Sequence, residues 1–221
     1  MTEKIHVYFM PGMAANPSIF DKIKLPKERF EHHYLEWFLP EHPDESIQDY
    51  AKRMTELITH KHPVLIGVSF GGILVQEMSR FISLRKLIVV SSIKTKNELP
   101  KHLKFLRQTK AYKILPTSLV SSVDVLAKFT LGDTIDKRIE LYRKYLSVND
   151  KRYLDWAIKN VVCWEQESAR PEAIYIHGDK DIVFPNSCDE NTIVIKGGTH
   201  IMVIDRYKWF NENLPKLILE T

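Results

Sequence analysis

The chain has 221 residues, of which 44% are hydrophobic, and a formal net charge of only +4. A chain of this length can bury a sizeable core in one domain, so no second domain is required. No apolar run approaches the roughly 20 residues that a membrane-spanning helix needs, and no motif of a nucleic-acid-binding protein accompanies the modest charge. These features predict a single-domain protein that neither crosses a membrane nor binds nucleic acid.

Targeting and redox features of the sequence point to one compartment. Residues 1–4 lead directly into an apolar strand pattern, without the hydrophobic segment of a signal peptide. Two cysteines, Cys163 and Cys188, are too few for a disulfide framework and do not have metal-ligand spacing. We therefore expect a cytoplasmic protein in which both thiols are reduced, and the sequence leaves the oligomeric state open.

Short apolar strands alternate with helical segments, which is typical of a mostly parallel α/β sheet with helices on both faces. The pattern predicts six strands, near residues 4–10, 32–37, 63–68, 85–91, 173–177 and 192–195. It predicts helices over residues 46–60, 71–83 and 205–214. Residues 94–169 carry no strand pattern, and their helical, charge-rich sequence interrupts a core formed by residues 1–93 and 170–221.

The third predicted strand runs without a loop into Gly67-Val68-Ser69-Phe70-Gly71. Gly-x-Ser-x-Gly at a strand-to-helix junction is typical of a nucleophile elbow, in which the serine is held in a strained conformation. Gly67 and Gly71 lack the β-carbons that would clash in so sharp a turn. The following apolar spacing predicts a helix whose N-terminal dipole favours an anion beside Ser69. The pattern also arises by chance, and this context favours Ser69 as a nucleophile.

Two further motifs complete a set of groups in the order Ser, Asp, His. The fifth predicted strand runs into Gly178-Asp179-Lys180-Asp181, and the residues alone leave Asp179 and Asp181 nearly tied as the carboxylate that orients a histidine. The last predicted strand precedes a glycine-rich loop ending at His200, which is free to bring an imidazole to the serine. A serine, a base and an orienting acid are what nucleophilic catalysis by serine requires.

Through these three motifs the chain resembles the α/β-hydrolase superfamily, and the resemblance covers nearly its whole length. It implies an α/β-hydrolase fold with Ser69 as nucleophile, Asp181 as acid and His200 as general base. It favours Asp181 over Asp179, which then has a structural role such as bonding the backbone N–H groups of its turn. His177 resembles the superfamily's strand-ending histidine, which supports the loop and does no chemistry.

The resemblance also implies an oxyanion hole formed by the backbone N–H of Phe70 and an N–H from the loop after the first strand. That loop begins Pro11-Gly12-Met13-Ala14. Relatives usually have a His-Gly pair here, so Pro11 departs from the pattern while Gly12 keeps it. We expect Met13 to supply the second N–H, with Ala14 as the alternative donor. The alternative to an oxyanion hole is that this loop is an ordinary strand-to-helix turn.

Residues 94–169 occupy the position of the superfamily's helical cap insertion, which covers the nucleophile. Apolar residues here could line an acyl cavity, although aromatics at helical spacing more often simply form core. Seven basic residues lie from Lys94 to Lys113, against Glu98 alone. We interpret them as a solvated helix face; the alternative is a patch for an anionic substrate, an acyl-carrier phosphopantetheine or a lipid headgroup. The apolar candidates are Leu99, Leu103, Leu106, Tyr112, Ile114, Leu115, Leu119, Val123, Leu126, Phe129, Tyr153, Trp156 and Trp164.

The remaining histidines suggest no metal site, because none has a carboxylate or cysteine at metal spacing. No G-x-G-x-x-G follows a strand, so neither a dinucleotide site nor a P-loop is predicted, and we expect no cofactor. The histidines concerned are His6, within the first predicted strand, and His32, His33, His42, His60, His62 and His102, in polar or helical contexts.

The sequence therefore predicts a serine hydrolase that cleaves a small-molecule carboxylic ester or thioester through an acyl-enzyme intermediate. A hydroxynitrile-lyase-like or C–C bond hydrolase reaction is the alternative within enzymes, because the same triad can serve it. A dehalogenase is disfavoured because its nucleophile is Asp. A non-catalytic small-ligand-binding protein is the least favoured interpretation, since all three members of the triad are present.

Overall fold

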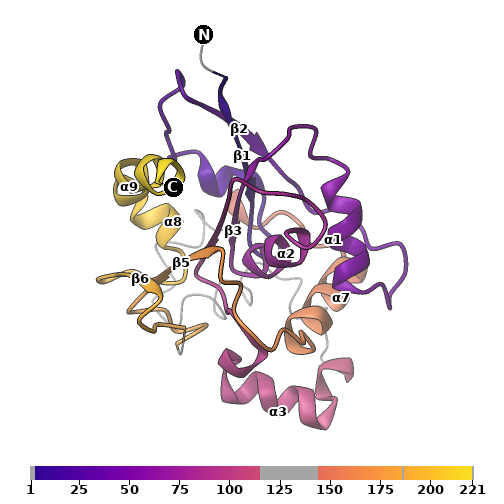
Figure 1. Cartoon of the computed structure of the whole chain (residues 1–221). Helices are drawn as coiled ribbons and strands as arrows, with labels where there is room; N and C mark the ends of the chain where they lie inside the picture. Colours follow the sequence, from indigo (N-terminus) through magenta and orange to yellow (C-terminus); the bar gives the residue numbers. More distant parts are fainter. Residues whose placement is uncertain (1–2, 115–143, 186, 221) are drawn as a thin grey trace.

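A computed structural model describes residues 3–114, 144–185 and 187–220 of the chain. Its centre is one six-stranded sheet of order β2-β1-β3-β4-β5-β6, in which every neighbouring pair is parallel (Figure 1). This confirms the predicted parallel sheet of six strands. The strands are β1 (Ile5–Met10), β2 (Phe30–Tyr34), β3 (Val64–Val68), β4 (Lys86–Val90), β5 (Ala173–Gly178) and β6 (Thr192–Ile195).

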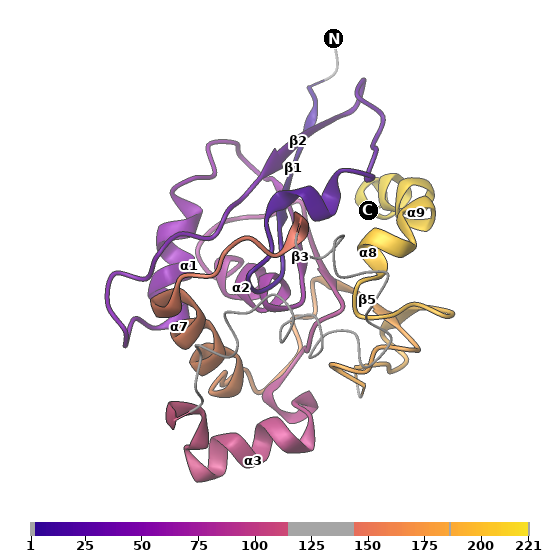
Figure 2. The same ribbon diagram turned by 180° about the vertical axis from the view of Figure 1, so that it is seen from behind.

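Helices cover both faces of the sheet, as predicted (Figures 1 and 2). One face carries α1 (Ile47–Thr55), α2 (Phe70–Met78) and α7 (Lys151–Val162), and the other carries the 3-10 turn η1 (Pro17–Phe20), α8 (Met202–Asp205) and α9 (Tyr207–Leu219). Successive strand residues point to opposite faces. Tyr8 and Met10 therefore pack into the core beneath α1, α2 and α7 (the first core), while Val7 and Phe9 pack into the core beneath η1, α8 and α9 (the second core). The sheet is therefore buried on both sides, as parallel sheets require.

β2 begins two residues and ends three residues earlier than its prediction at 32–37. Pairing with β1 sets the register from Ile5 opposite Phe30 to Phe9 opposite Tyr34, and Phe30 buries its ring in the second core. Trp37 therefore lies beyond the strand, where it packs into the first core.

α1 and α2 end earlier than predicted, at Thr55 and Met78. Beyond these residues the backbone bonds tighten to the residue three positions earlier, as in Ile58 N–H to Thr55 and Phe81 N–H to Met78, a common way for a helix to finish. The predicted helix 205–214 is instead α8 and α9, which continues past Pro215 and buries Leu214 and Ile218.

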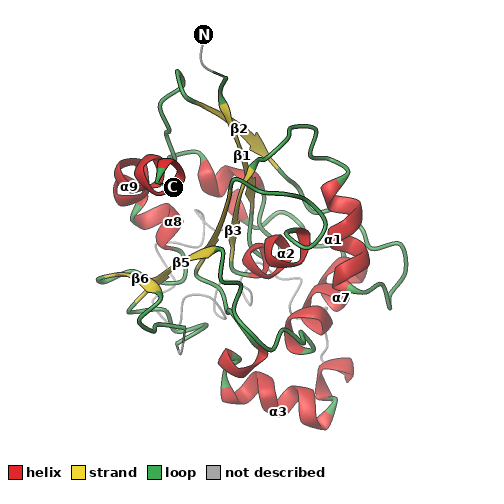
Figure 3. Cartoon of the chain, viewed as in Figure 1, coloured by secondary structure: helices red, strands yellow, loops and turns green. Residues whose placement is uncertain are grey.

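In the described parts of residues 94–169 the structure has helices and loops but no strand of the sheet (Figure 3). They hold η2 (Lys96–Glu98), α3 (Lys101–Thr109), η3 (Ala111–Ile114) and α7. Leu115, Leu119, Val123, Leu126 and Phe129 lie outside the described residues, as does the side chain of Ile114. Five of the other apolar candidates are buried in the first core, namely Leu99, Leu103, Tyr153, Trp156 and Trp164. That residues 94–169 act as a cap remains a prediction.

Two further expectations concern membranes and cysteines. No helix in the described ranges is long and apolar enough to cross a membrane. Cys163 and Cys188 are both free thiols, as expected from their number and spacing.

Candidate active site

The predicted nucleophile elbow lies at the carboxyl end of β3, a strand buried at every position. Ser69 has φ 55° and ψ −120°, a strained backbone that persists only when surrounding contacts fix it. A β-carbon on Gly67 would lie 2.3 Å from the Gly71 carbonyl oxygen, and one on Gly71 would lie 2.3 Å from that of Pro11. The two glycines therefore permit the tight turn and its packing against the loop after β1.

The structure brings Ser69, His200 and Asp181 together in one hydrogen-bonded chain. His200 lies 2.9 Å from Ser69 Oγ through Nε2, and 2.9 Å from Asp181 Oδ2 through Nδ1. An ionised carboxylate can only accept a hydrogen bond, so Nδ1 carries the proton and Nε2 of a neutral ring accepts from the serine. This tautomer is the one that lets a histidine act as general base toward a serine.

Four donors surround the Asp181 carboxylate, whose side chain is fully buried. Oδ1 accepts the backbone N–H groups of Val183 at 2.8 Å and Phe184 at 3.0 Å. Oδ2 contacts His200 and, at 3.2 Å, Nε2 of His177. Burial by itself raises the Asp181 pKa, but the charge of His200 and the hydrogen bonds to the carboxylate outweigh it and hold the pKa well below its usual range. The carboxylate is therefore ionised whenever the protein is folded near neutral pH.

Asp181 and Asp179, which the residues alone leave nearly tied, occupy different positions. Asp179 Oδ1 accepts the backbone N–H of Gly197 at 2.6 Å, so this partner lies in the loop before His200 and not in its own turn as expected, while Asp181 contacts His200. The two segments meet closely, because a β-carbon on Gly178 would lie 2.2 Å from the Gly198 carbonyl oxygen. This contact fixes the acid turn against the histidine loop.

The loop after β1 lies against the elbow, where an oxyanion hole is predicted. A β-carbon on Gly12 would lie 3.4 Å from Cβ of Ser69. The alternative donor, the Ala14 N–H, points to the Tyr153 hydroxyl at 3.3 Å. Among the described residues, no protein acceptor takes the N–H of Met13 or Phe70. Both groups are thus available to a ligand, in keeping with the predicted pair.

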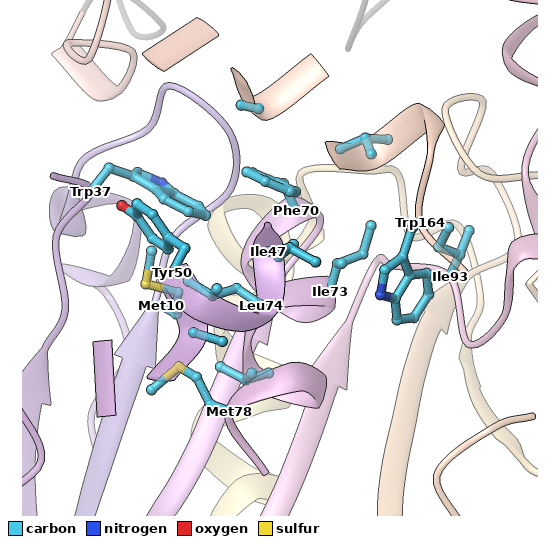
Figure 4. Close-up of a cluster of buried hydrophobic side chains, with 14 of the residues drawn as sticks. Met10, Trp37, Ile47, Tyr50, Phe70, Ile73, Leu74, Met78, Ile93 and Trp164 are labelled. Atoms are coloured by element: carbon cyan, nitrogen blue, oxygen red, sulfur yellow. The ribbon is translucent and has the colours of Figure 1, made fainter. Parts of the chain in front are cut away.

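Trp37 supports this loop, a role that the sequence does not reveal. Its indole N–H donates to the Gly12 carbonyl oxygen at 2.8 Å. Its ring stacks on Phe70 with centroids 4.9 Å apart and an interplanar angle of 8° (Figure 4). The indole therefore joins the loop after β1 to the residue that follows Ser69. The positions differ by 25 residues, so no local pattern could have shown the contact.

His177 also does more than the resemblance implied. Its Nε2 lies 3.0 Å from the Phe184 carbonyl oxygen, which can only accept, so Nε2 carries a proton. The same N–H faces Asp181 Oδ2 at 3.2 Å. His177 thus supports the loop and stabilises the charge of Asp181, and within the described part of the chain it forms no hydrogen bond with Ser69 or His200.

The basic segment from Lys94 to Lys113 is less exposed than expected, and for Lys94 the surface interpretation is wrong. Lys94 is buried, with Nζ 2.6 Å from Asp189 Oδ2. Lys96 and Arg107 each form an ion pair with Glu165. The surface charge is therefore lower than the sequence count implies. Among the described side chains of the segment, five basic residues remain at least partly exposed: Lys96, Lys101, Lys104, Arg107 and Lys110.

Comparison with known proteins gives a consistent architecture. Neither a protein-family model nor a curated protein sequence matches the chain. Among solved structures, a carboxylesterase structure from Nitrososphaera gargenis has TM-score 0.70 at 16% identity, covering 98% of this chain and 90% of that one. A bromoperoxidase from Bacillus anthracis has TM-score 0.71 at 15% identity, covering 99% and 93%. The N-acyl homoserine lactonase AidH has TM-score 0.67 at 18% identity, covering 98% and 89%.

Together with the parallel sheet and the strained serine after β3, these likenesses decide the architecture. The chain has the α/β-hydrolase fold. This confirms the fold that the sequence resemblance implied. The α/β-hydrolase neighbours described above include an esterase, a lactonase and a bromoperoxidase, so the fold leaves the reaction to be argued from the site.

Proposed function

We propose that the protein is a serine hydrolase that cleaves a carboxylic ester or thioester through an acyl-enzyme intermediate. The observation that carries the proposal is the pair of 2.9 Å contacts from Ser69 Oγ to His200 Nε2 and from His200 Nδ1 to Asp181 Oδ2. The esterase and lactonase among the structural neighbours support the same reaction class. We further propose a small-molecule substrate and, from the sequence, a cytoplasmic location.

In the first half of the reaction, Ser69 Oγ attacks the substrate carbonyl while His200 Nε2 takes the hydroxyl proton. Asp181 holds the imidazole in the required tautomer and stabilises the positive charge that forms on it. The Met13 and Phe70 N–H groups donate to the oxyanion of the tetrahedral intermediate. Collapse of that intermediate breaks the bond to the leaving alcohol or thiol, which receives the proton from His200.

The second half repeats these steps with water. His200 removes a proton from water as its oxygen attacks the acyl-enzyme, and the acid product leaves as Ser69 regains its proton. The 2.9 Å distance from His200 Nε2 to Ser69 Oγ supports the first proton transfer, which requires the two groups within hydrogen-bond distance.

The decisive experiment labels the nucleophile. A fluorophosphonate probe should modify Ser69 rapidly, and Ser69→Ala should abolish both labelling and turnover. Ser79→Ala is the matched control, because Ser79 lies directly after the helix that begins at the elbow. Its hydroxyl donates to the Gln76 carbonyl oxygen and accepts from the Arg170 guanidinium. Removing a triad nucleophile lowers turnover by about 10⁴-fold or more. A residual rate in Ser69→Ala within tenfold of wild type would remove Ser69 as nucleophile.

A substrate screen then tests the reaction class. p-Nitrophenyl esters of graded acyl length and acyl thioesters should be hydrolysed with burst kinetics if the acyl-enzyme accumulates. Labelling of Ser69 without turnover of any ester or thioester would refute the proposed reaction while leaving the nucleophile intact. Absence of both would favour a ligand-binding protein.

A further inference from the structure

The peptide group between Gly12 and Met13 carries one of the two N–H groups proposed for the oxyanion hole. Its carbonyl oxygen accepts two hydrogen bonds, from the Trp37 indole N–H at 2.8 Å and from the Ala15 backbone N–H at 3.1 Å. The described residues contain no cis peptide bond, and in a planar trans peptide the C=O and N–H point in opposite directions. The two donors therefore fix the direction of the Met13 N–H by holding the other end of the same peptide group.

Of the two donors, only the indole comes from outside the loop. The bond from Ala15 to Gly12 closes a turn within the loop, so it moves with the loop and cannot anchor it. Trp37 is 25 residues from Gly12 along the chain, and its side chain is buried. A hydrogen bond shielded from water is electrostatically stronger than the same bond in solvent. The indole therefore anchors this peptide group to the body of the protein.

The same indole packs against the residue that carries the second proposed donor. Its ring stacks on that of Phe70, with centroids 4.9 Å apart, and lies 6.1 Å from the ring of Tyr50 (Figure 4). The ring of Tyr153 lies 5.4 Å from the indole. Close packing among three aromatic neighbours leaves the indole little room to turn. Trp37 thus contacts both parts of the proposed oxyanion hole from one fixed position.

The residue after Met13 is held by a different segment of the chain. Ala14 has φ 61°, a left-handed backbone that a residue with a β-carbon keeps only when its surroundings fix it. Its N–H donates to the Tyr153 hydroxyl at 3.3 Å, and its carbonyl oxygen accepts the Val148 N–H at 3.0 Å. Met13 therefore lies between two anchored positions, and Trp37 provides the anchor that precedes it.

We propose that Trp37 is a positioning residue for the oxyanion hole, whose indole N–H holds the Gly12 carbonyl oxygen so that the Met13 N–H stays directed at the developing oxyanion. This inference rests on the proposed ester or thioester cleavage. A hydrogen bond to the carbonyl oxygen also polarises the peptide group and strengthens its N–H as a donor. The oxyanion develops only as the reaction proceeds, so a misplaced donor should lower kcat and leave KM unchanged.

The test compares steady-state ester hydrolysis by wild type and Trp37→Phe, which loses the indole N–H but keeps a ring beside Phe70. Removing an oxyanion donor outright costs about 10²–10³-fold in kcat, and this variant only loosens one, so kcat should fall about 10- to 100-fold. KM should stay at the wild-type value. Hexyl trifluoromethyl ketone forms an adduct with the serine that carries an oxyanion, and its Ki should rise by the factor by which kcat/KM falls. If Trp37→Phe fails to fold, benzothienylalanine at position 37, with sulfur in place of the indole N–H, gives the same test with the ring preserved.

Trp164→Phe is the matched control, because it removes the same atoms from another buried indole of the first core. The Trp164 indole N–H donates to Glu77 Oε1 at 2.7 Å, and a hydrogen bond to a carboxylate stabilises a fold more than one to a neutral acceptor. Thermal unfolding should therefore show a loss of Tm at least as large as in Trp37→Phe. The kcat, the KM and the Ki of the ketone should stay at wild-type values.

An active wild type with unchanged kcat in Trp37→Phe would overturn this inference and leave the proposed function standing. A change confined to KM would overturn it as well, because it would show that Trp37 acts on substrate binding. An equal loss of kcat in Trp164→Phe would overturn it by attributing the effect to core stability. A wild type that neither reacts with the fluorophosphonate nor hydrolyses any ester or thioester would overturn the proposed function and this inference with it.

Discussion

Replacing Asp181 by Asn tests the acid turn most sharply, because each oxygen of that carboxylate has defined partners. In the variant, the amide oxygen can still accept from Val183 and Phe184, which lie 2.8 and 3.0 Å from Oδ1. The amide nitrogen replaces Oδ2 and can no longer accept from His200 or His177. His200 can answer only by moving its proton to Nε2, which then faces Ser69 with a donor in place of an acceptor.

The two consequences differ in size. One hydrogen bond to a charged group, that from His177, is lost outright, which costs about 1.5–3 kcal/mol of unfolding free energy. The wrong tautomer of His200 should lower kcat by about 10⁴-fold, equivalent to about 5.5 kcal/mol of transition-state stabilisation at 1.36 kcal/mol per tenfold. Catalysis should therefore suffer more than stability, giving a folded and nearly inactive protein.

Urea unfolding and steady-state ester hydrolysis measure these two quantities on the same samples, with Asp179→Asn as the matched control. Asp179 accepts one backbone N–H, that of Gly197, and an asparagine oxygen can accept it equally well. We expect the control to keep kcat within about tenfold of wild type. A larger loss in Asp179→Asn than in Asp181→Asn, or equal losses of kcat in both, would refute the assignment of Asp181 as the orienting acid.

Three further predictions follow from burial, packing and charge. Because the folded Asp181 pKa lies below the value of about 3.9 in an unfolded chain, wild type should lose unfolding free energy as pH falls below about 4; a pH series of urea unfolding should show a flatter curve for Asp181→Asn. Gly178→Ala should lower both Tm and kcat, because the new β-carbon would lie 2.2 Å from the Gly198 carbonyl oxygen; unchanged Tm and kcat would contradict the close contact. Reversal of Lys101 and Lys104 to Glu should leave KM unchanged for acidic and neutral esters if α3 is a solvated face, whereas a KM increase confined to acidic esters and fading with salt would indicate substrate recruitment.

The sequence predicted best what depends on local pattern. β3 and the turn at Ser69 were predicted from an apolar run that continues directly into Gly-x-Ser-x-Gly. Five of the six strands match within about two residues at each end, because a strand buried on both faces reads as a short continuous apolar segment. The motifs and their chain order named Ser69 and His200 but left Asp179 and Asp181 nearly tied; the family resemblance favoured Asp181, which the structure places in contact with His200.

Contacts between distant segments could not be predicted in the same way. Trp37 contacts Gly12, and Lys94 contacts Asp189, although each pair is far apart in the sequence. Such contacts leave no repeating pattern in the sequence. The basic count in the helical segment therefore overstated its surface charge. Helix ends were also missed, because α1 closes with tighter turns while its polar sequence continues the helical pattern.

The proposed catalytic residues differ greatly in how far apart they lie along the chain. Asp181 and His200 are 19 residues apart, within one β5–β6 unit, whereas Ser69 and His200 are 131 apart. The acid–base pair is thus a local contact, while the contact with the nucleophile requires β3, β4 and β5 to be assembled in order. Partial opening between β4 and β5 would separate the serine from an intact Asp–His pair. Under mild denaturant, activity should therefore disappear before global unfolding, because such sub-global openings have lower free energies than complete unfolding.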